Sequence, residues 1–467
     1  MKAAAMPAQR PSIKEGSVSD TAKKKIIQAL CTILLFSVMN ATMFNIALPA
    51  IATQYQLLPS QVGWVVTGYI IIYALGSLTY GKLSDIYPMK KLLTIGLILF
   101  AVGSLIGALS TTYWMVLAAR LIQSAGASSI PALAMLIPTR YFPVSERGKV
   151  LGIIASMIAF ASGVGPIVAG FITGTLHWKF LFLISLGALL TLPIFRKYLP
   201  DDQQSGKKLD VVGGLLFGGS IACVLVSITN FHWLVLLAGI LLFVLFLFRQ
   251  NQVSNPFIQA EIFSIRTYRN TLIVSFITGM AAFGTMIMLP LMLTHVNLLS
   301  PNWIGLVLFP GAMSAAIMGR VGGKLVDKIG GVRVARISLL LLVAGTFLLS
   351  TFSGYAAFVI ALCLMVVSVG QSFGQSSLAT LVSTSLPKEL TGVGMGIYSM
   401  INFMSGAFSG AMITKILDFP VSELALNPLG LHGPGVVYSN VFLGLFLLVL
   451  INLLFFTSST RKLVARK

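Results

Sequence analysis

One arginine lies deep inside an apolar stretch of the chain. Arg120 stands eight residues into the run 113–137, and Gln123 follows at a spacing that places both side chains on one helical face. A guanidinium in lipid costs at least ~2.5 kcal/mol, so Arg120 must face protein groups and find partners there. Two interpretations are open. Arg120 either meets a neutral or anionic group in the interior, or forms a hydrogen-bonded hub that holds this helix to the one at 26–50.

Two similar charged segments follow apolar runs that lie 242 residues apart. They are GKLSDIYPMKK at 81–91 and GKLVDKIGGVR at 323–333. Gly81 and Gly323 allow neighbouring helix backbones to approach closely. Asp85 and Asp327 can accept hydrogen bonds from a helix N-terminus or pair with basic residues. The repetition predicts a contact that joins two halves of the molecule in one state and separates in another; the alternative is an ordinary charged loop.

Polar and aromatic side chains are scattered through the other apolar runs. An apolar cavity with a few polar contacts suits an amphipathic ligand. We therefore expect a cavity lined by Asn40, Gln123, Phe160, Tyr398 and Asn402. For any single aromatic residue among them, packing in the core or against lipid is the simpler interpretation.

Membrane-spanning helices must position these residues, as the composition indicates. The chain has 467 residues, of which 57% are hydrophobic and only 9% charged, whereas a soluble chain carries roughly 25% charged residues. Its surface must therefore face lipid. About 20 apolar residues cross a bilayer. Fourteen runs meet that length: 26–50, 62–81, 92–110, 113–137, 150–173, 179–195, 211–229, 233–248, 271–293, 303–322, 335–352, 355–381, 391–415 and 437–457.

The basic residues are distributed unevenly between the loops of this arrangement. The chain holds 32 lysine and arginine residues and a net charge of +20. With the N-terminus in the cytoplasm, 29 of them fall on the cytoplasmic side, and only Lys179 and Lys415 fall on the other. This is a strong positive-inside bias. We expect a multi-pass protein of a cell membrane, with both termini in the cytoplasm and a basic balance that reflects topology rather than nucleic-acid binding.

Several kinds of chemistry find no support in the sequence. The three cysteines lie inside apolar runs, and the four histidines lie near the outer face without ligand spacing. Neither a disulfide framework nor a metal site is therefore expected. The chain has no phosphate-binding GxxxxGK[ST] loop and no nucleophile–base constellation. We expect no cofactor, no enzymatic activity and no engine driven by ATP hydrolysis.

Four motifs together carry a family resemblance. GKLSDIYPMKK resembles the loop signature of major facilitator transporters, and RLIQSAG (120–126) resembles their helix-4 signature. SGVGPIVAG (162–170) is similar to the helix-5 signature of drug antiporters. MNATMFNIALPAIA (39–52) resembles the helix-1 signature of the fourteen-span drug:proton antiporters. Within that family the chain is most similar to the Gram-positive tetracycline efflux branch.

The resemblance implies an all-α membrane protein with the major facilitator fold, two six-helix bundles plus two extra helices. The runs at 211–229 and 233–248 are then the extra pair, and each repeated charged segment closes the second helix of its bundle. The expected divisions are an N-terminal tail at 1–25, a first bundle at 26–200, a two-helix insertion at 201–260, a second bundle at 261–458 and a C-terminal tail at 459–467.

The resemblance also implies roles for particular residues. Arg120 is expected to act in coupling or in contact with substrate, and Asp85 and Asp327 in gating. The antiporter motif comprises Gly163, Gly165, Pro166 and Gly170. Proline kinks a helix and glycines allow close packing, so this helix is expected to close the pore toward one side.

The chain departs from the family in its carboxylates. None of its twelve acidic residues falls in the middle of a predicted span. The tetracycline branch carries glutamates where this chain has Ala41, Ser162 and Gly406, and the wider group often has an aspartate where it has Asn40. The proton would then be carried by Asp85 with the Arg120 charge as its counterpart, by the substrate itself, or by no group if transport is not proton-coupled.

The favoured function is secondary active efflux of drugs, either multidrug or tetracycline-type, by proton antiport with alternating access. Such activity would confer antibiotic resistance. One alternative is an exporter of an endogenous neutral or anionic metabolite or lipid. The other is a membrane sensor that does not transport, which only the missing acids support. The expected partners are a small amphipathic substrate, protons and the lipid bilayer, and the protein is expected to be a monomer.

Overall fold

The computed structural model describes residues 19–464, apart from residue 85 and the segments 201–209, 251, 254–255, 259, 420–423 and 431–434. Within that part of the chain the regular structure is helical, with no strand. The helices of the first half are α1 (Asp20–Tyr55), α2 (Pro59–Leu83), α3 (Met89–Ala108), α4 (Tyr113–Ala127), α5 (Ser129–Tyr141), α6 (Val144–Thr175), α7 (Phe180–Ser185), η1 (Leu186–Thr191) and α8 (Leu192–Tyr198). Those that follow are α9 (Val211–Asn230), α10 (Trp233–Gln250), η2 (Ala260–Ser264), α11 (Arg266–His295), α12 (Pro301–Ile329), α13 (Gly331–Thr351), α14 (Ala357–Thr384), α15 (Lys388–Ile416) and α16 (Val436–Val464).

Twelve helical segments of the described chain are long and apolar enough to cross a bilayer. Every predicted run coincides with one helix or with consecutive helices, but the runs 150–173 and 391–415 belong to α6 and α15, which are not among the twelve. In α6 only Phe160–Thr175 stands out, as a shorter apolar helix. The helical, multi-pass architecture is confirmed, and the count of fourteen spans is not.

Two of the predicted spans are interrupted, each just before a proline. The run 113–137 divides at Ser128 into α4 and α5, and the run 179–195 passes through η1 between α7 and α8. Pro131 and Pro193 have no backbone N–H, so neither can donate to the carbonyl four residues earlier. The sequence predicted continuous helices here because apolar composition alone does not register a single missing hydrogen bond.

Polar residues at helix starts satisfy the first backbone N–H groups. The Ser19 hydroxyl accepts a hydrogen bond from Ala22 N at the start of α1 (3.3 Å). The Thr112 hydroxyl accepts one from Met115 N at the start of α4 (3.4 Å). Thr112 directly precedes the apolar run 113–137, whereas Ser19 begins α1 seven residues before the run 26–50, so that α1 extends beyond its apolar part.

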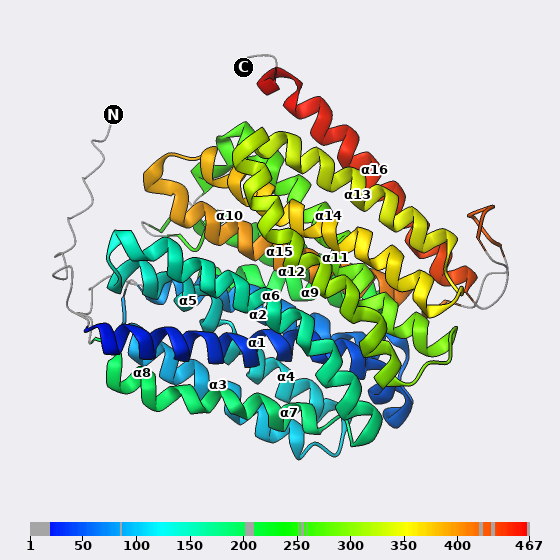
Figure 1. Cartoon of the computed structure of the whole chain (residues 1–467), viewed down its shortest axis with the longest axis horizontal. Coiled ribbons are helices and arrows are strands. Elements are labelled where there is room, and N and C mark those ends of the chain that lie inside the picture. Colours follow the sequence, from blue (N-terminus) through cyan, green and yellow to red (C-terminus); the bar gives the residue numbers. More distant parts are fainter. Residues whose placement is uncertain are drawn as a thin grey trace.

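The helices form two groups that lie side by side (Figure 1). We call α1–α8 the N-terminal group and α11–α16 the C-terminal group. Within the groups, α1 packs on α6, α3 on α4, and α14 on both α12 and α13. Across the boundary, the principal pairs are α6 with α12 and α2 with α15. Apolar side chains from both groups join one continuous core.

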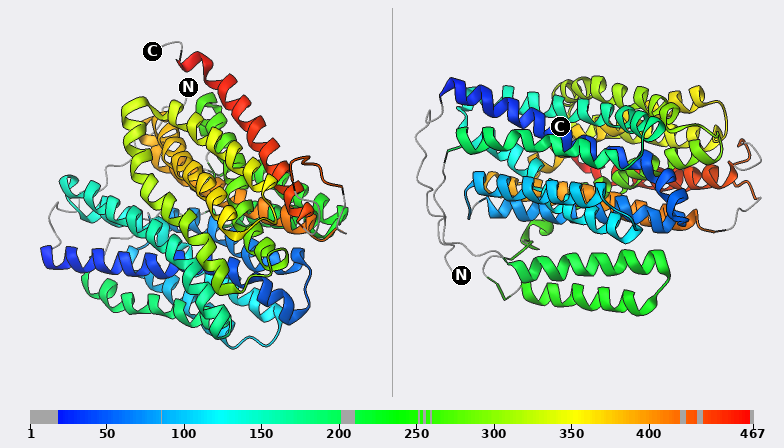
Figure 2. Two further views of the ribbon diagram at one scale, coloured as in Figure 1. Left: turned by 45° about the vertical axis from the view of Figure 1, so that its right-hand side comes forward. Right: turned by 90° about the horizontal axis from the view of Figure 1, so that it is seen from below.

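The remaining pair, α9 and α10, forms a hairpin on one side of the groups, drawn in green in the right view of Figure 2. Only α9 packs against the rest of the molecule to any extent, on α2 and α15. At Gly218 of α9 the backbone approaches the side chain of Leu75 on α2. Along α10 many large apolar side chains are exposed, as expected for a helix that faces lipid.

The two groups approach each other more closely at one end than at the other. We call the end at which α1 finishes the Tyr55 end, and the opposite one the Asp20 end. At Gly170 in α6, an added Cβ atom would lie 2.6 Å from Pro301 O of α12. At Gly163, two turns nearer the Asp20 end, the nearest atom would be 3.5 Å away.

The contact between α2 and α15 is likewise tighter at the Tyr55 end than at the Asp20 end. A Cβ atom added at Gly63, near the Tyr55 end, would lie 2.8 Å from the Thr414 side chain, whereas one at Gly396, near the Asp20 end, would lie 3.5 Å from Leu78. In the left view of Figure 2 the two groups are inclined to each other and converge toward the Tyr55 end. Both helix pairs are therefore closed at the Tyr55 end and looser at the Asp20 end.

Candidate functional site

Arg120 is fully buried in the N-terminal group and donates to three neutral acceptors. Its Nη1 donates to Asn40 Oδ1 on α1 (2.8 Å) and to Gln123 Oε1 one turn along α4 (2.7 Å). Its Nε donates to Val65 O on α2 (3.2 Å). One guanidinium thus joins three helices, which is the geometry that the hub interpretation requires. We call this the Arg120 cluster: Arg120, Asn40, Gln123, Val65, Phe44 and Tyr69.

Two aromatic rings enclose the same guanidinium. Arg120 Cζ lies 4.0 Å from the centroid of Phe44 and 3.9 Å from that of Tyr69. A desolvated cation–π contact contributes up to about 2 kcal/mol. In the described chain no carboxylate contacts Arg120. Ring faces and neutral oxygens therefore stabilise a charge that usually has an acid beside it.

The two amides of the cluster are themselves fixed by serines. Asn40 Nδ2 donates to Ser185 Oγ (2.6 Å), and Gln123 Nε2 donates to Ser104 Oγ (2.8 Å). Both amide side chains are fully buried. Neither Asn40 nor Gln123 is therefore open to a cavity in this conformation, although the sequence predicted that they would line one. Ser104 and Ser185 were missed, since single serines in apolar helices carry little signal.

Two polar groups in the Arg120 cluster have no hydrogen-bond partner among the described residues. They are Arg120 Nη2 and the hydroxyl of Tyr69, both fully shielded from solvent. A buried donor without an acceptor costs about 1–3 kcal/mol. These two groups can still donate hydrogen bonds. A neutral or anionic ligand with an acceptor atom would satisfy them, whereas a cation would not.

Aromatic contacts connect the Arg120 cluster to the C-terminal group. Tyr69 stacks on Tyr73, with ring centroids 5.8 Å apart, and Tyr73 meets the Phe403 ring of α15 edge to face at 4.8 Å. Three side chains therefore link the buried guanidinium to the boundary between the groups. Sequence reasoning noted aromatic side chains in the apolar runs in general but had no means of ordering them in space.

The other predicted cavity residues lie elsewhere. Asn402 on α15 donates to Tyr398 O (3.1 Å) and accepts from Ser275 Oγ of α11 (3.0 Å). Tyr398 is buried, whereas the Phe160 side chain on α6 is half-exposed. The five residues therefore divide between the Arg120 cluster, α15 and an exposed face of α6.

The first repeated charged segment forms a turn after α2. Ser84 Oγ donates to Gly81 O (2.7 Å), and Arg140 Nη1, at the end of α5, donates to Ser84 O (2.8 Å). Asp85 itself lies outside the described residues. Arg140 was not singled out from the sequence, although a basic residue at a cytoplasmic helix end is a natural partner for turn carbonyls.

The second segment continues as helix where the first turns. α12 runs through Asp327 to Ile329 and stops at Gly330, whose φ of +87° favours glycine. Asp327 is exposed and forms no ion pair within the described chain. The expected contact at Asp327 is therefore not formed in this conformation.

The glycines that begin the two segments do not serve the expected close packing here. A Cβ atom added at Gly81 or at Gly323 would meet nothing within 4 Å. These positions lie at the Asp20 end, where the groups are looser. Their close approach to a neighbouring helix would require a conformation in which that end closes.

The antiporter motif of α6 packs against two different helices. Gly165 abuts Thr42 of α1 so closely that no side chain fits. Pro166 O faces Gly305 of α12, and the backbone of Gly170 meets the same helix one turn later. α6 stays helical through Pro166. The motif therefore lies where α6 contacts both its own group and the opposite one.

Asp418, which the sequence did not single out, joins the two groups at the Tyr55 end. It follows α15, and its Oδ1 accepts a hydrogen bond from Ser60 N in the first turn of α2 (2.9 Å). Its Oδ2 pairs with Lys415 Nζ (3.4 Å). An acid placed directly after the apolar run 391–415, three residues beyond Lys415, was the available signal.

The whole arrangement has counterparts among known proteins. The family model described as "Major Facilitator Superfamily" matches residues 30–211 and 210–410. A riboflavin transporter of Clostridioides difficile (strain 630) is 25% identical over 400 residues, covering 84% of this chain and 87% of that protein. A lincomycin resistance protein of Listeria monocytogenes serovar 1/2a is 28% identical over 399 residues, covering 81% and 83%.

Solved structures of low sequence identity share the fold. A bacterial homolog to the human lysosomal transporter Spinster, in an inward-facing and unoccupied conformation, aligns with a TM-score of 0.66 at 12% identity, covering 95% of this chain and 98% of that one. A D-xylose–proton symporter aligns with a TM-score of 0.70 at 14% identity, covering 93% and 97%. At these identities the likeness concerns the fold alone.

Proposed function

Because the chain belongs to the Major Facilitator Superfamily, we propose that it exports small amphipathic molecules across a bacterial cytoplasmic membrane by alternating access. The two groups of helices would rock about the α6–α12 and α2–α15 pairs and expose a shared interior to each side in turn. The proposed bundles are residues 26–200 and 261–458, with 201–260 inserted between them. α6 and α15 would also cross the bilayer, which makes fourteen spans.

One observation carries this proposal: both helix pairs between the groups are tight at the Tyr55 end and looser at the Asp20 end. The basic residues of the loops lie predominantly at the Asp20 end, which the positive-inside rule assigns to the cytoplasm. The described conformation is then closed to the outside and looser toward the cytoplasm.

The Arg120 cluster supports a restriction on the substrate. A permanently charged, fully buried guanidinium with neutral partners and an unused Nη2 would repel a cation and favour an acceptor group. We propose an uncharged or anionic substrate of drug type. The relative named for riboflavin transport fits this class, whereas lincomycin, for which the other relative is named, carries a basic amine. Tetracycline belongs in the test panel because of the resemblance of the motifs.

The coupling ion is proposed to be the proton. Asp85, which follows Ser84 in the first repeated charged segment, is one candidate carrier, and a substrate that binds or releases the proton itself is the other. The protein would act as a monomer, with the substrate, protons and the bilayer as its partners.

The experiment is proton exchange in everted membrane vesicles that contain a pH-sensitive dye. Tetracycline, lincomycin, riboflavin and matched anionic and cationic drugs are each added after a gradient has formed. We expect the gradient to dissipate with uncharged or anionic compounds and not with cationic ones. Arg120→Ala should abolish the response, whereas Arg196→Gln, a change at an exposed arginine at the end of α8, should not.

Unchanged exchange in the Arg120→Ala protein would remove Arg120 from the mechanism. A response to cations alone would overturn the substrate class. A metabolite exporter is the second candidate, favoured by the riboflavin relative. It predicts a response to riboflavin or a similar vitamin and none to the antibiotics.

A further inference from the structure

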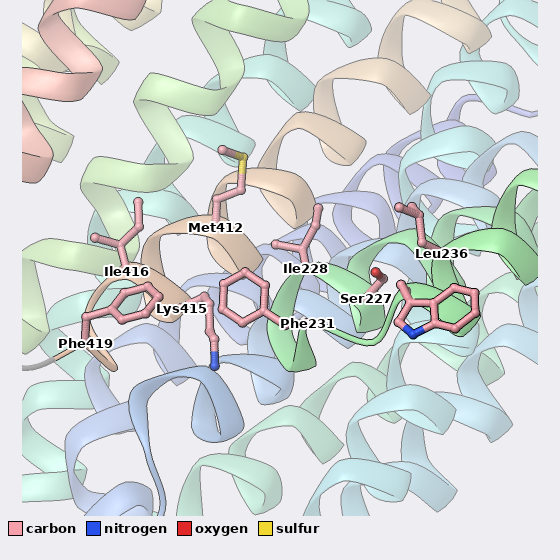
Figure 3. A pocket seen from close by; sticks show the side chains of 9 residues that line it. Ser227, Ile228, Phe231, Leu236, Met412, Lys415, Ile416 and Phe419 are labelled. Atoms are coloured by element: carbon pink, nitrogen blue, oxygen red, sulfur yellow. The ribbon is translucent and has the colours of Figure 1, made fainter.

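The extra helix hairpin meets the main body at the place where Asp418 joins the two groups. A pocket of about 440 Å³ lies between the α9–α10 turn and the end of α15 (Figure 3). Its walls are apolar apart from Ser227 and Lys415. In Figure 3 the Phe231 ring from the hairpin turn stands next to the Lys415 side chain from α15. The hairpin is thus positioned to act on the Asp418 contact.

Four residues form a continuous series from the hairpin to the N-terminal group. We call it the Asp418 series, and its members are Phe231, Lys415, Asp418 and Ser60. Lys415 Nζ lies 5.1 Å from the centroid of the Phe231 ring and 3.4 Å from Asp418 Oδ2. Asp418 Oδ1 lies 2.9 Å from Ser60 N. The series crosses from α9 to α15 and then to α2.

The bond between Asp418 and Ser60 is favourable for two reasons. Ser60 N belongs to the first turn of α2, where backbone N–H groups lack intrahelical acceptors and the helix dipole favours a negative charge. The Asp418 side chain is only 7% exposed, so water and salt screen the interaction weakly. A charge-assisted hydrogen bond of this kind is stronger than a neutral one.

Lys415 positions the carboxylate, and Phe231 positions Lys415. Phe231 has a φ of 55°, which non-glycine residues rarely adopt, and the backbone there turns the ring toward α15. Its ring also lies 6.1 Å from that of Phe419, directly after Asp418. Since α2 and α15 belong to opposite groups, separating them at the Tyr55 end must break the bond between Asp418 and Ser60.

We infer that the α9–α10 hairpin stabilises the state closed at the Tyr55 end, by holding Lys415 and Asp418 against the N-terminus of α2. This inference rests on the proposed alternating access. It assigns the extra helix pair a positioning role in gating. The hairpin would set how often the Tyr55 end opens and would not contribute to substrate binding in the Arg120 cluster.

The test measures opening directly and needs neither substrate nor a proton gradient. In a protein without its native cysteines, spin labels are attached through Thr111→Cys and Ser300→Cys, two exposed positions at the Tyr55 end of opposite groups. Double electron–electron resonance in lipid nanodiscs then gives the ratio of open to closed distances. Monodisperse gel filtration and an unchanged thermal unfolding profile identify the variants that are folded.

We expect Asp418→Asn to raise the open-to-closed ratio about tenfold or more, because a charge-assisted bond is lost. Lys415→Gln and Phe231→Ala should raise it about two- to fivefold. The matched control is Trp233→Ala: Trp233 lines the same pocket and is 66% exposed, as is Phe231, but the cation–π contact of Lys415 is with Phe231. Asp418→Glu should restore much of the closed population.

Each outcome decides one part of the inference. An unchanged ratio in Asp418→Asn would overturn it entirely, whatever the vesicle assay shows. A change in Asp418→Asn with none in Phe231→Ala, or equal changes in Phe231→Ala and Trp233→Ala, would overturn the role of the hairpin. If the ratios change as expected while no compound dissipates the gradient, the inference stands and the proposed export fails.

Discussion

At the scale of single residues, the chain solves the problem of a buried arginine without an acid. Amide oxygens, one backbone carbonyl and two aromatic ring faces surround Arg120, and each is neutral. The charge of the site is therefore positive, whereas an aspartate at the position of Asn40 would make it neutral.

Asn40→Asp therefore tests the role of the site charge. The new carboxylate would occupy the place of an oxygen that lies 2.8 Å from Arg120 Nη1, so it should form a buried ion pair. We expect transport of anionic compounds to fall at least tenfold and transport of cationic ones to appear, measured by gradient dissipation for each class. Asn40→Gln, which keeps residue 40 uncharged and the site positive, is the control, and identical selectivity in both variants would contradict the prediction.

Asp210 gives a pH-dependent prediction outside the bilayer. Burial opposes its ionisation, but hydrogen bonds from Arg249 Nε (2.8 Å) and Gly213 N (3.0 Å) outweigh burial and hold its pKa below the ordinary 3.8. Because the pKa of Asp210 is lower in the folded state, its ionised carboxylate stabilises the folded hairpin at pH values above the pKa of the unfolded state. This contribution to stability is lost as the pH falls through the pKa of the folded state.

The measurement compares thermal unfolding of the natural protein and the Asp210→Asn variant between pH 8 and pH 3. The natural protein should be more stable by about 1–2 kcal/mol down to roughly pH 5, and the difference should shrink as the pH falls below 3.8. A difference that grows toward acid pH would show that the carboxyl is not stabilised by its partners.

At the scale of helices, the contact between α6 and α12 decides which end is closed. At Gly170 an added methyl group meets backbone on the opposite helix, at 2.6 Å from Pro301 O and 3.3 Å from Gly305 Cα. Backbone atoms cannot rotate away as a side chain can. The pair tolerates no enlargement at this point, in contrast to its looser part near the Asp20 end.

Gly170→Ala and Gly163→Ala form a matched pair of changes on one helix. We expect Gly170→Ala to destabilise the state closed at the Tyr55 end by about 1–3 kcal/mol and to slow transport at least fivefold. At Gly163 the nearest atom is 3.5 Å away, which is an ordinary contact, so that variant should behave like the natural protein. Rates in the vesicle assay and spin-label distances check both, and equal effects would refute the difference in packing.

At the scale of the whole molecule, the direction of the charge bias orients the transporter. The Tyr55 end carries Lys179 and Lys415, whereas the loops at the Asp20 end carry most of the other basic residues. In the proposed orientation, the end that is closed in this structure is the outer one. The proposed exporter would then present its interior to the cytoplasm in this state.

Labelling of single cysteines in intact cells checks this orientation. Leu109→Cys, which is exposed at the Tyr55 end, should react with a membrane-impermeant maleimide added outside. Arg333→Cys, which is exposed at the Asp20 end, should react only after the membrane has been permeabilised. The reverse pattern would place the N-terminus outside and would make the described state outward-open.

The sequence by itself determined the helical membrane architecture, the buried Arg120 and the duplicated charged segments, because composition, hydrophobic run length and charge bias are properties of the local chain. The sequence predicted that Asn40 and Gln123 would form part of the wall of a substrate cavity. In the structure both side chains are buried as hydrogen-bond partners of the Arg120 guanidinium. Only the tertiary structure decided which distant groups meet. The neutral shell of Arg120 and the bond between Asp418 and Ser60 join residues 55 to 358 positions apart, and no local pattern records such pairings.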